Sequence, residues 1–173
     1  MIMTVEELRN QVDCGSDSDE LITAKLQAVE AVIRQYTNNN FQQRAARFEG
    51  RSSGSQLFGN PQYFRIGDTV QISASGVNDG LYVVQEIGTD YITVNQPLFD
   101  VEKNLVTKIF YPADVKQCAV DLYRWKQTNG AKVGIKSETL SRHSVTYEDS
   151  ATLYMGYPVG ILNGLLLHRK ARC

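Results

Sequence analysis

The residues best suited to acid–base or metal chemistry in this chain are its two histidines, His143 and His168. His143 lies in the run Ser141-Arg142-His143-Ser144, where composition alone would allow a serine nucleophile activated by an imidazole base. Adjacent residues of an extended segment point to opposite faces, which places such a pair badly. Neither histidine has the partner four residues away, or the neighbouring Cys and Asp, that metal sites use. The sequence therefore predicts no catalytic residue and no metal ligand.

A glycine-rich stretch, residues 130–137, has the composition of a phosphate-binding loop but not its spacing. A P-loop has four residues between its two glycines and a lysine directly after the second glycine. Here three residues separate Gly130 from Gly134, and Ile135 stands between Gly134 and Lys136. The stretch also follows a predicted helix, whereas a P-loop follows a strand. We therefore expect no nucleotide or other cofactor to bind this chain.

The acidic residues near the N-terminus are better explained by helix capping than by cation binding. Asp17 and Asp19 lack the central glycine and the terminal glutamate of a calcium loop. Asp19 and Glu20 instead stand at the expected start of a helix, where the helix dipole favours negative charge. We expect them to stabilise that helix.

The overall composition is that of an ordinary globular protein. The chain has 173 residues, of which 42% are hydrophobic and 21% charged, and a formal net charge of −1. This balance gives no electrostatic reason to expect binding to nucleic acid or to an anionic membrane. Three widely spaced cysteines, Cys14, Cys118 and Cys173, favour a reducing compartment over a disulfide framework. We expect neither a secretory signal nor a membrane span, because no apolar run is long enough.

Capping signals and apolar periodicity predict four helices. The first begins at Thr4, because Thr4-Val5-Glu6-Glu7 has the pattern of a capping box, and it ends by Cys14-Gly15. The second carries an apolar stripe from Ile22 to Tyr36 and stops at the polar run of residues 37–40. The third begins at Pro112 and the fourth at Pro158.

Between the second and third helices the hydrophobic period changes to that of strands. Residues 70–73 alternate as a half-buried strand should, and Asn78-Asp79-Gly80 is typical of a tight turn. Further short strands are expected at residues 81–84, 91–94 and 106–110. Four or five short strands predict a small antiparallel barrel or sandwich, which we place at residues 50–110. Residues 41–62 are expected to form a polar bridge into it.

Small barrels that bind nucleic acid interleave basic residues with aromatic ones. In the predicted insert, Arg65, Lys103 and Lys108 are sparse, and acidic residues outnumber them. We therefore expect no nucleic-acid binding by the insert.

A long polar stretch, residues 130–157, is not explained by a simple core. A loop of this length is uncommon in a compact domain and is usually functional or disordered. It contains large apolar and aromatic residues, which argue against disorder. We expect it to become ordered against a partner, such as another copy of the chain.

The predicted fold is therefore α+β. A small bundle of about four helices occupies residues 1–49 and 111–173, and an antiparallel barrel or sandwich is inserted at residues 50–110. Within the helical domain, residues 133–157 form an extended assembly arm before the last helix.

Two segments carry a resemblance to a known family. One runs from Asp19-Glu20-Leu21-Ile22 through the second helix to Thr37-Asn38-Asn39-Asn40-Phe41. The other runs from Gly134 to Tyr147 and continues at Met155-Gly156-Tyr157-Pro158. Together they resemble the head–tail connector proteins, also called adaptor or head-completion proteins, of long-tailed, siphovirus-like bacteriophages and prophages. The order of helices, insert and extended loop agrees with that family, as does the β insert with its Gly67-Asp68-Thr69-Val70 start.

The resemblance implies a structural role in the virion, in a protein made in the bacterial host cytoplasm, and no enzymatic activity. Such proteins form a ring, usually of twelve subunits, beneath the portal protein. The ring extends the DNA channel and supplies the docking surface for the stopper or tail-completion protein. DNA would only pass through, and no cofactor or membrane is implied. The alternatives are a stopper or tail-completion protein of the same connector, and a small DNA-binding regulator.

By position, the extended arm and the last helix would contact the portal and neighbouring subunits. The expected interface residues are Ile135, Leu140, His143, Val145, Tyr147, Tyr154, Tyr157, Ile161, Leu162, Leu165, Leu166, Arg169, Lys170 and Arg172. Deletion of residues 158–173 is expected to leave a folded protein that no longer binds the portal.

Overall fold

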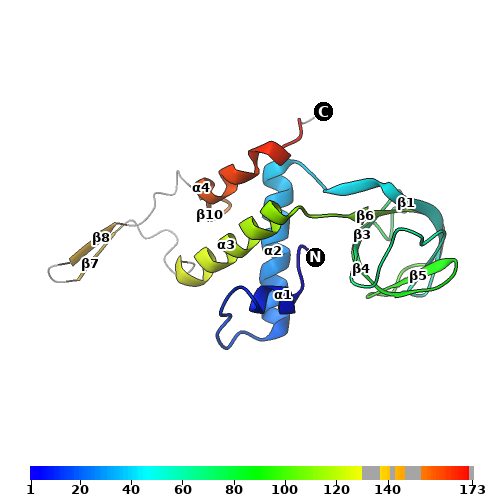
Figure 1. The fold of residues 1–173 in the computed structure, drawn as a ribbon, viewed down its shortest axis with the longest axis horizontal. Coiled ribbons are helices and arrows are strands. Elements are labelled where there is room, and N and C mark those ends of the chain that lie inside the picture. Colours follow the sequence, from blue (N-terminus) through cyan, green and yellow to red (C-terminus); the bar gives the residue numbers. More distant parts are fainter. Residues whose placement is uncertain (130–136, 141–142, 147–152, 172–173) are drawn as a thin grey trace. The chain divides into compact units, whose positions relative to one another are not determined.

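The computed structural model describes residues 1–129, 137–140, 143–146 and 153–171 (Figure 1). The chain divides into two compact units. The barrel unit consists of Met1 and Asn40–Tyr111, and the α-rich unit consists of Ile2–Asn39 and Pro112–Cys173. Each unit is considered by itself.

The barrel unit is a closed antiparallel barrel with the strand order β1-β2-β5-β4-β3-β6. Its strands are β1 (Gln42–Ser53), β2 (Gln56–Phe58), β3 (Thr69–Ser73), β4 (Gly80–Ile87), β5 (Tyr91–Val94) and β6 (Val101–Ile109). The apolar side chains that fill it are Phe48, Leu57, Phe64, Val70, Ile72, Val84, Ile92, Val94, Leu98 and Val106. Closure pairs the first strand with the last, which leaves no open sheet edge.

Strand β1 occupies residues for which the sequence predicted a polar bridge. Its inward side chains at Ala46, Phe48 and Ser52 are buried and alternate with exposed charged ones. Only one of the three is large and apolar, so the period of two is hard to recognise in the sequence. Gly50 lies on the same inward side, and a Cβ there would be 1.7 Å from the carbonyl oxygen of Phe58. Only glycine lets the backbone at this point approach Phe58 so closely.

A buried polar network lies inside the barrel unit beside its apolar core. The side chains of Asn104 and Asn78 are 0% and 1% exposed. Asn104 Nδ2 donates to the carbonyl oxygen of Gly50 and to Ser52 Oγ, both at 3.1 Å. Asn78 Oδ1 accepts from the amide of Phe99 at 2.9 Å. Because buried polar groups need partners, these bonds fix how β1, β6 and the loop segments around Asn78 and Phe99 meet.

The α-rich unit is built on two long helices that pack on each other, α2 (Asp19–Thr37) and α3 (Ala113–Asn129). Helix α1 (Val5–Arg9) begins at the predicted capping box of Thr4 and Glu7. The remaining elements are β7 (Ser137–Leu140), β8 (His143–Thr146), β9 (Leu153–Tyr154), β10 (Tyr157–Pro158), α4 (Val159–Leu162) and the 3₁₀-helix η3 (Asn163–His168). Strand β7 pairs antiparallel with β8, and β9 with β10, so part of the stretch expected to be extended forms paired strands.

The predicted bundle of about four helices is wrong. In the described part of the chain only α2 and α3 are long, whereas α1 has 5 residues and α4 has 4. Helix α1 ends at Arg9, after which Val12 and Cys14 are buried in a loop. Helix α4 gives way to η3 at Asn163 and Gly164, where a glycine weakens an α-helix by about 1 kcal/mol relative to alanine. The structure is α+β, with a six-stranded closed barrel and a second unit of mixed helices and short strands.

Candidate functional site

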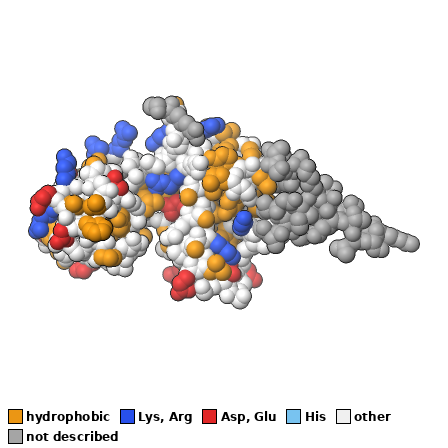
Figure 2. Space-filling view, turned by 180° about the vertical axis from the view of Figure 1, so that it is seen from behind, with side chains coloured by type: hydrophobic (Ala, Val, Ile, Leu, Met, Phe, Trp, Pro, Cys, Tyr) orange, Lys and Arg blue, Asp and Glu red, His pale blue; other side chains and the backbone are white. Residues whose placement is uncertain are grey.

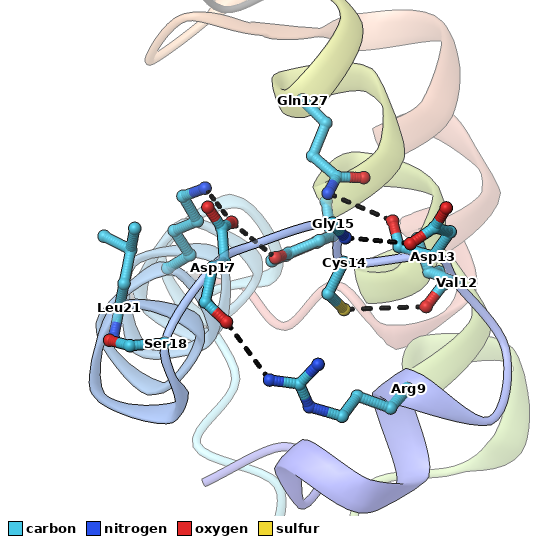
Figure 3. Close-up of polar contacts among 11 residues, drawn as sticks. Arg9, Val12, Asp13, Cys14, Gly15, Asp17, Ser18, Leu21 and Gln127 are labelled. Atoms are coloured by element: carbon cyan, nitrogen blue, oxygen red, sulfur yellow. Dashed lines mark hydrogen bonds and ion pairs between the residues drawn. The ribbon is translucent and has the colours of Figure 1, made fainter.

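The loop between α1 and α2, residues 10–18, is held by hydrogen bonds to neighbouring helices (Figure 3). Arg9 Nη2 donates to the carbonyl oxygen of Asp17 at 3.1 Å, and Gln127 Nε2 on α3 donates to that of Asp13 at 3.3 Å. The Asp13 carboxylate accepts from the amide of Gly15 at 2.8 Å. The loop is therefore a structural connection, and its polar groups are used within the unit.

The acidic residues at the start of α2 also have partners inside the unit. Asp17 accepts from Lys25 Nζ, and from the hydroxyl of Tyr123 at 3.2 Å. The hydrogen bond from Lys25 lowers the pKa of Asp17, while burial raises the pKa of Tyr123. Ser18 caps the helix and accepts from the amide of Leu21, which confirms that this segment starts α2. Within the described ranges, no three His, Cys, Asp or Glu side chains are grouped so that they could hold a metal ion.

The C-terminal segment, residues 153–171, presents the surface of the α-rich unit best suited to a partner. Leu162 and Leu165 are 0% and 1% exposed and hold α4 and η3 in the core. Leu166 is 51% exposed and Leu167 is 94% exposed. Covering one such leucine stabilises a complex by about 1.5–3 kcal/mol. The exposed residues Met155, Leu166, Leu167, Arg169 and Lys170 are called the C-terminal surface below.

The polar run after α2 fastens this segment to the unit. Asn38 takes a left-handed conformation, with φ 48°, and its Nδ2 donates to the carbonyl oxygen of Ala171 at 3.1 Å. Asn39 Nδ2 donates to the carbonyl oxygen of His168 at 3.0 Å, and the carbonyl oxygen of Thr37 accepts from the amide of Lys170 at 2.8 Å. Sequence reasoning treated this run only as a helix stop. A helix C-cap needs only one asparagine, so the consecutive asparagines were the sequence signal for a second role of this run.

Tyr36 is one of the residues that line a polar hollow at the edge of the C-terminal surface. Its hydroxyl donates to Asn163 Oδ1 at 2.9 Å, and its ring meets that of Tyr154 edge-on at 5.3 Å between centroids. The guanidinium of Arg169 lies 6.0 Å from the centroid of the Tyr36 ring. The hollow has a volume of about 320 Å³ and is lined by Gln35, Tyr36, Asn38, Arg169, Lys170 and Ala171. Two cations on its lining suit an acidic side chain of a partner.

Two further contacts join the C-terminal segment to α3. His168 Nε2 lies 2.6 Å from Asp114 Oδ2, and the hydrogen bond from His168 lowers the pKa of Asp114. The thiol of Cys118 lies 3.7 Å from the carbonyl oxygen of Ile161. Burial raises the pKa of Cys118 to about 12, so the group is a neutral thiol at physiological pH and a poor nucleophile. Both contacts serve to position the segment.

The predicted interface residues fall into different environments. Tyr157, Leu162 and Leu165 are buried, Tyr154 and Ile161 are half-buried, and Leu166, Arg169 and Lys170 are exposed. Leu140, His143 and Val145 lie on β7 and β8, where Leu140 faces His143 and Glu138 faces Val145 in the backbone register. Ile135, Tyr147 and Arg172 lie outside the described residues.

The exposed members gather near the end of the chain. Figure 2 shows hydrophobic side chains clustered on one face of the α-rich unit. Met155 and Leu167, which are 57% and 94% exposed, belong to the C-terminal surface but were not predicted. The sequence does not distinguish them from neighbouring residues that are buried, and only the structure shows that they are exposed.

The chain matches no protein-family model, and no curated protein is significantly similar to it in sequence. None of the helices in the part of the chain that the structure describes has the length and apolar character needed to cross a bilayer. The resemblance to head–tail connector proteins therefore rests on the sequence segments and the order of elements alone.

Proposed function

We propose that this chain is a structural virion protein of the head–tail connector. Copies of it form a ring beneath the portal, extend the DNA channel, and give the stopper or tail-completion protein a surface on which to dock. The number of subunits, usually twelve, follows from the resemblance. The protein is made in the cytoplasm of the bacterial host and ends in the virion.

The observation that carries this proposal is the C-terminal surface. Leu167 is 94% exposed, yet the segment that bears it is held in place by the fully buried Leu162 and Leu165. Arg169 and Lys170 follow directly and are exposed. An apolar centre beside polar and charged groups, presented on an ordered scaffold, is the arrangement of a protein–protein docking site. It supports binding to a partner such as the portal.

A ring also requires each subunit to meet its neighbours through two different faces. The paired strands β7 and β8 give the α-rich unit a second candidate contact, distinct in sequence from the C-terminal surface.

The alternatives are less well supported. Stopper and tail-completion proteins are typically dominated by β-structure, whereas this chain has an α-rich unit with two long helices. A DNA-binding regulator needs a helix with free basic side chains. On α2 and α3, Lys25 contacts Asp17, Lys116 contacts Glu7, and Arg124 donates to the carbonyl oxygen of Gln11. These cations serve contacts within the unit.

Electron microscopy of the purified protein mixed with the portal of the same virus tests the proposal, and rings stacked on the portal are expected. Deletion of residues 158–173 is a poor perturbation, because it would remove the buried Leu162 and Leu165 from the core. Leu167→Asp changes a side chain that is 94% exposed and should leave the fold intact. We expect it to weaken portal binding about 10- to 150-fold, the equivalent of one buried leucine.

The matched control is Leu21→Asp, which changes a leucine on α2 that is 45% exposed and lies outside the C-terminal surface. It should bind the portal as the unmodified chain does. If Leu167→Asp binds as well as Leu21→Asp, the C-terminal surface is not the docking site. If the unmodified chain forms no ring on the portal, the proposed function is wrong.

A further inference from the structure

The outer face of β1 carries exposed arginines that the sequence assigned to different segments. Arg47 and Arg51 alternate with buried residues, so both point outward, and Arg44 lies in the irregular stretch between Gln42 and Arg47. All three are exposed. Figure 2 shows Lys and Arg side chains along the upper edge of the barrel, where Figure 1 places β1. The barrel therefore has a basic face that residue counts over 50–110 could not reveal.

The negative charges of the barrel are largely engaged within it. Glu49 forms an ion pair with Lys103, and Asp68 forms one with Lys108. Backbone amides also bind carboxylates: Asp68 accepts from Arg65, Asp79 from Ser75 and Gly76, and Asp100 from Gly54. A second copy of the chain would therefore have few unengaged barrel carboxylates with which to pair these arginines.

The arginines differ from these residues. Within the described part of the chain, neither Arg44 nor Arg47 lies within ion-pair distance of an acidic group. Their guanidinium groups keep their full donor capacity for an external anion. Guanidinium groups suit phosphate in particular, because their planar array of donors matches its oxygens.

Aromatic rings adjoin one end of this basic face. The guanidinium of Arg51 lies 4.1 Å from the centroid of the Phe58 ring, and the Phe58 and Tyr91 rings are 6.1 Å apart. Arg51, Phe58 and Tyr91 thus form a row across β1, β2 and β5. The row ends at Glu86, whose carboxylate accepts from the Tyr91 hydroxyl at 3.3 Å. Basic residues beside aromatic ones are the composition that barrels use to bind nucleic acid.

We propose that the outer face of β1, formed by Arg44, Arg47 and Arg51 beside Phe58, binds the phosphate backbone of double-stranded DNA. Arg51 lies four steps along the strand from Arg47, or about 13 Å at roughly 3.3 Å per residue. That span is close to the width of the major groove, about 12 Å, so the two side chains can reach phosphates of both strands. Contacts to phosphate carry no sequence information, so binding is nonspecific.

This inference goes beyond the proposed function, since it stands on the barrel unit alone and holds whether or not the chain forms a ring. It replaces the expectation from the sequence that the insert does not bind nucleic acid. That expectation counted Arg65, Lys103 and Lys108, two of which are used in ion pairs, and it placed Arg44 and Arg47 in a bridge.

Fluorescence anisotropy of a short labelled duplex of random sequence, titrated with the full chain at several salt concentrations, tests the proposal. Each phosphate contact adds about −0.9 to the slope of log K against log salt. Three contacts predict that affinity falls about 40-fold between about 50 and 200 mM salt. Arg44→Ser with Arg47→Ser leaves one contact, for which the fall is only about 3.5-fold.

The control is Arg65→Ser, which removes an exposed arginine of the barrel unit from the loop before β3. It should keep the steep salt dependence, and Arg47→Ser alone should reduce the slope by about 0.9. The proposal is overturned if the unmodified chain does not bind duplex at about 50 mM salt, or if the double variant keeps the full slope. Tighter binding to a single strand than to duplex would overturn the assignment to double-stranded DNA. Self-association without DNA, abolished in the double variant, would identify the face as a contact between copies.

Discussion

Replacing Asn78 by alanine tests whether the buried polar network holds the barrel unit together. The side chain is 1% exposed, and its Nδ2 lies 2.9 Å from the carbonyl oxygen of Phe99, 3.2 Å from Ser52 Oγ and 3.3 Å from Asn104 Oδ1. Its Oδ1 accepts from the amide of Phe99 at 2.9 Å. After the substitution, Ser52 still donates to the Phe99 carbonyl at 2.7 Å. The Phe99 amide and Asn104 Oδ1 lose the partner that Asn78 supplied.

Each buried group left without a partner costs about 1–3 kcal/mol. The site around the Phe99 amide is partly accessible to water, which reduces that contribution. We therefore expect Asn78→Ala to lower the free energy of unfolding of the barrel unit by about 2–4 kcal/mol. The assay is hydrogen exchange at the slowest amides of β3, β4 and β6, which report opening of the barrel. Their exchange should accelerate roughly 30- to 900-fold.

Amides of α3 supply an internal reference, because they belong to the α-rich unit. The matched substitution is Asn60→Ala, which removes an exposed side chain that accepts only from the amide of Gln62, at 3.0 Å. It should change the stability by less than about 0.5 kcal/mol. Exchange in Asn78→Ala within twofold of the unmodified chain would refute the reasoning. Equal acceleration in α3 would show that the two units do not open separately.

Two further predictions concern titratable groups of the α-rich unit. Burial raises the pKa of Cys118 to about 12. Iodoacetamide near pH 8 should therefore leave Cys118 unmodified in the folded chain and alkylate it in the unfolded chain. Peptide mass spectrometry measures the alkylation, and rapid alkylation of the folded chain would contradict the prediction. His168 lowers the pKa of Asp114, so the stabilisation by this pair is complete above the ordinary aspartate value, about 3.9, and is lost as pH falls through the lowered folded value. Thermal unfolding between about pH 5 and pH 1 should therefore show a shallower loss of stability for Asp114→Asn than for the unmodified chain, and identical acid limbs would count against the pair.

The predictable part of the barrel is the part with strong alternation. Strands expected at residues 70–73, 81–84, 91–94 and 106–110 fall within or overlap β3, β4, β5 and β6. Residues 70–73 and 91–94 carry an apolar residue at every second position, residues 81–84 are apolar or aromatic throughout, and residues 106–110 begin and end with large apolar residues. Strand β1 was missed because its inward positions include Ala46, Gly50 and Ser52. At Gly50 the backbone of Phe58 occupies the space, and at Ser52 the Asn104 network does, which only the folded structure shows.

The helices were likewise predictable where the apolar pattern was long enough to be recognised. Helices α2 and α3 have 19 and 17 residues, enough turns for the apolar stripe to be recognised. The capping box at Thr4 correctly marked the start of α1, but a start signal does not determine length. Beyond Arg9, side chains of α3 bind the carbonyl oxygens of Gln11 and Asp13, which no local pattern encodes. Tertiary contacts therefore decided where α1 ends.

The candidate site was predicted as a region of the chain but not as a set of exposed residues. A period of 3.6 groups Ile161, Leu162, Leu165 and Leu166 on one face, whereas η3 is a 3₁₀-helix with three residues per turn. At that period Leu162 and Leu165 fall on one line and are both buried, while Leu166 turns outward. The change in helix type thus decides which leucine is core and which is available to a partner. The change in helix type falls at Asn163 and Gly164, which are not apolar and so do not enter a pattern of apolar residues.

The proposals for the C-terminal surface and for the basic face of β1 can be refuted independently of each other. Leu167 belongs to the α-rich unit and Arg47 to the barrel unit, and each unit buries its own set of side chains. An exposed substitution in one unit leaves the core of the other untouched, so its effect on stability should stay local. If the unmodified chain forms no ring on the portal but binds DNA, the ring is refuted and the basic face of β1 is not. The reverse result would leave a connector protein whose barrel has some other partner.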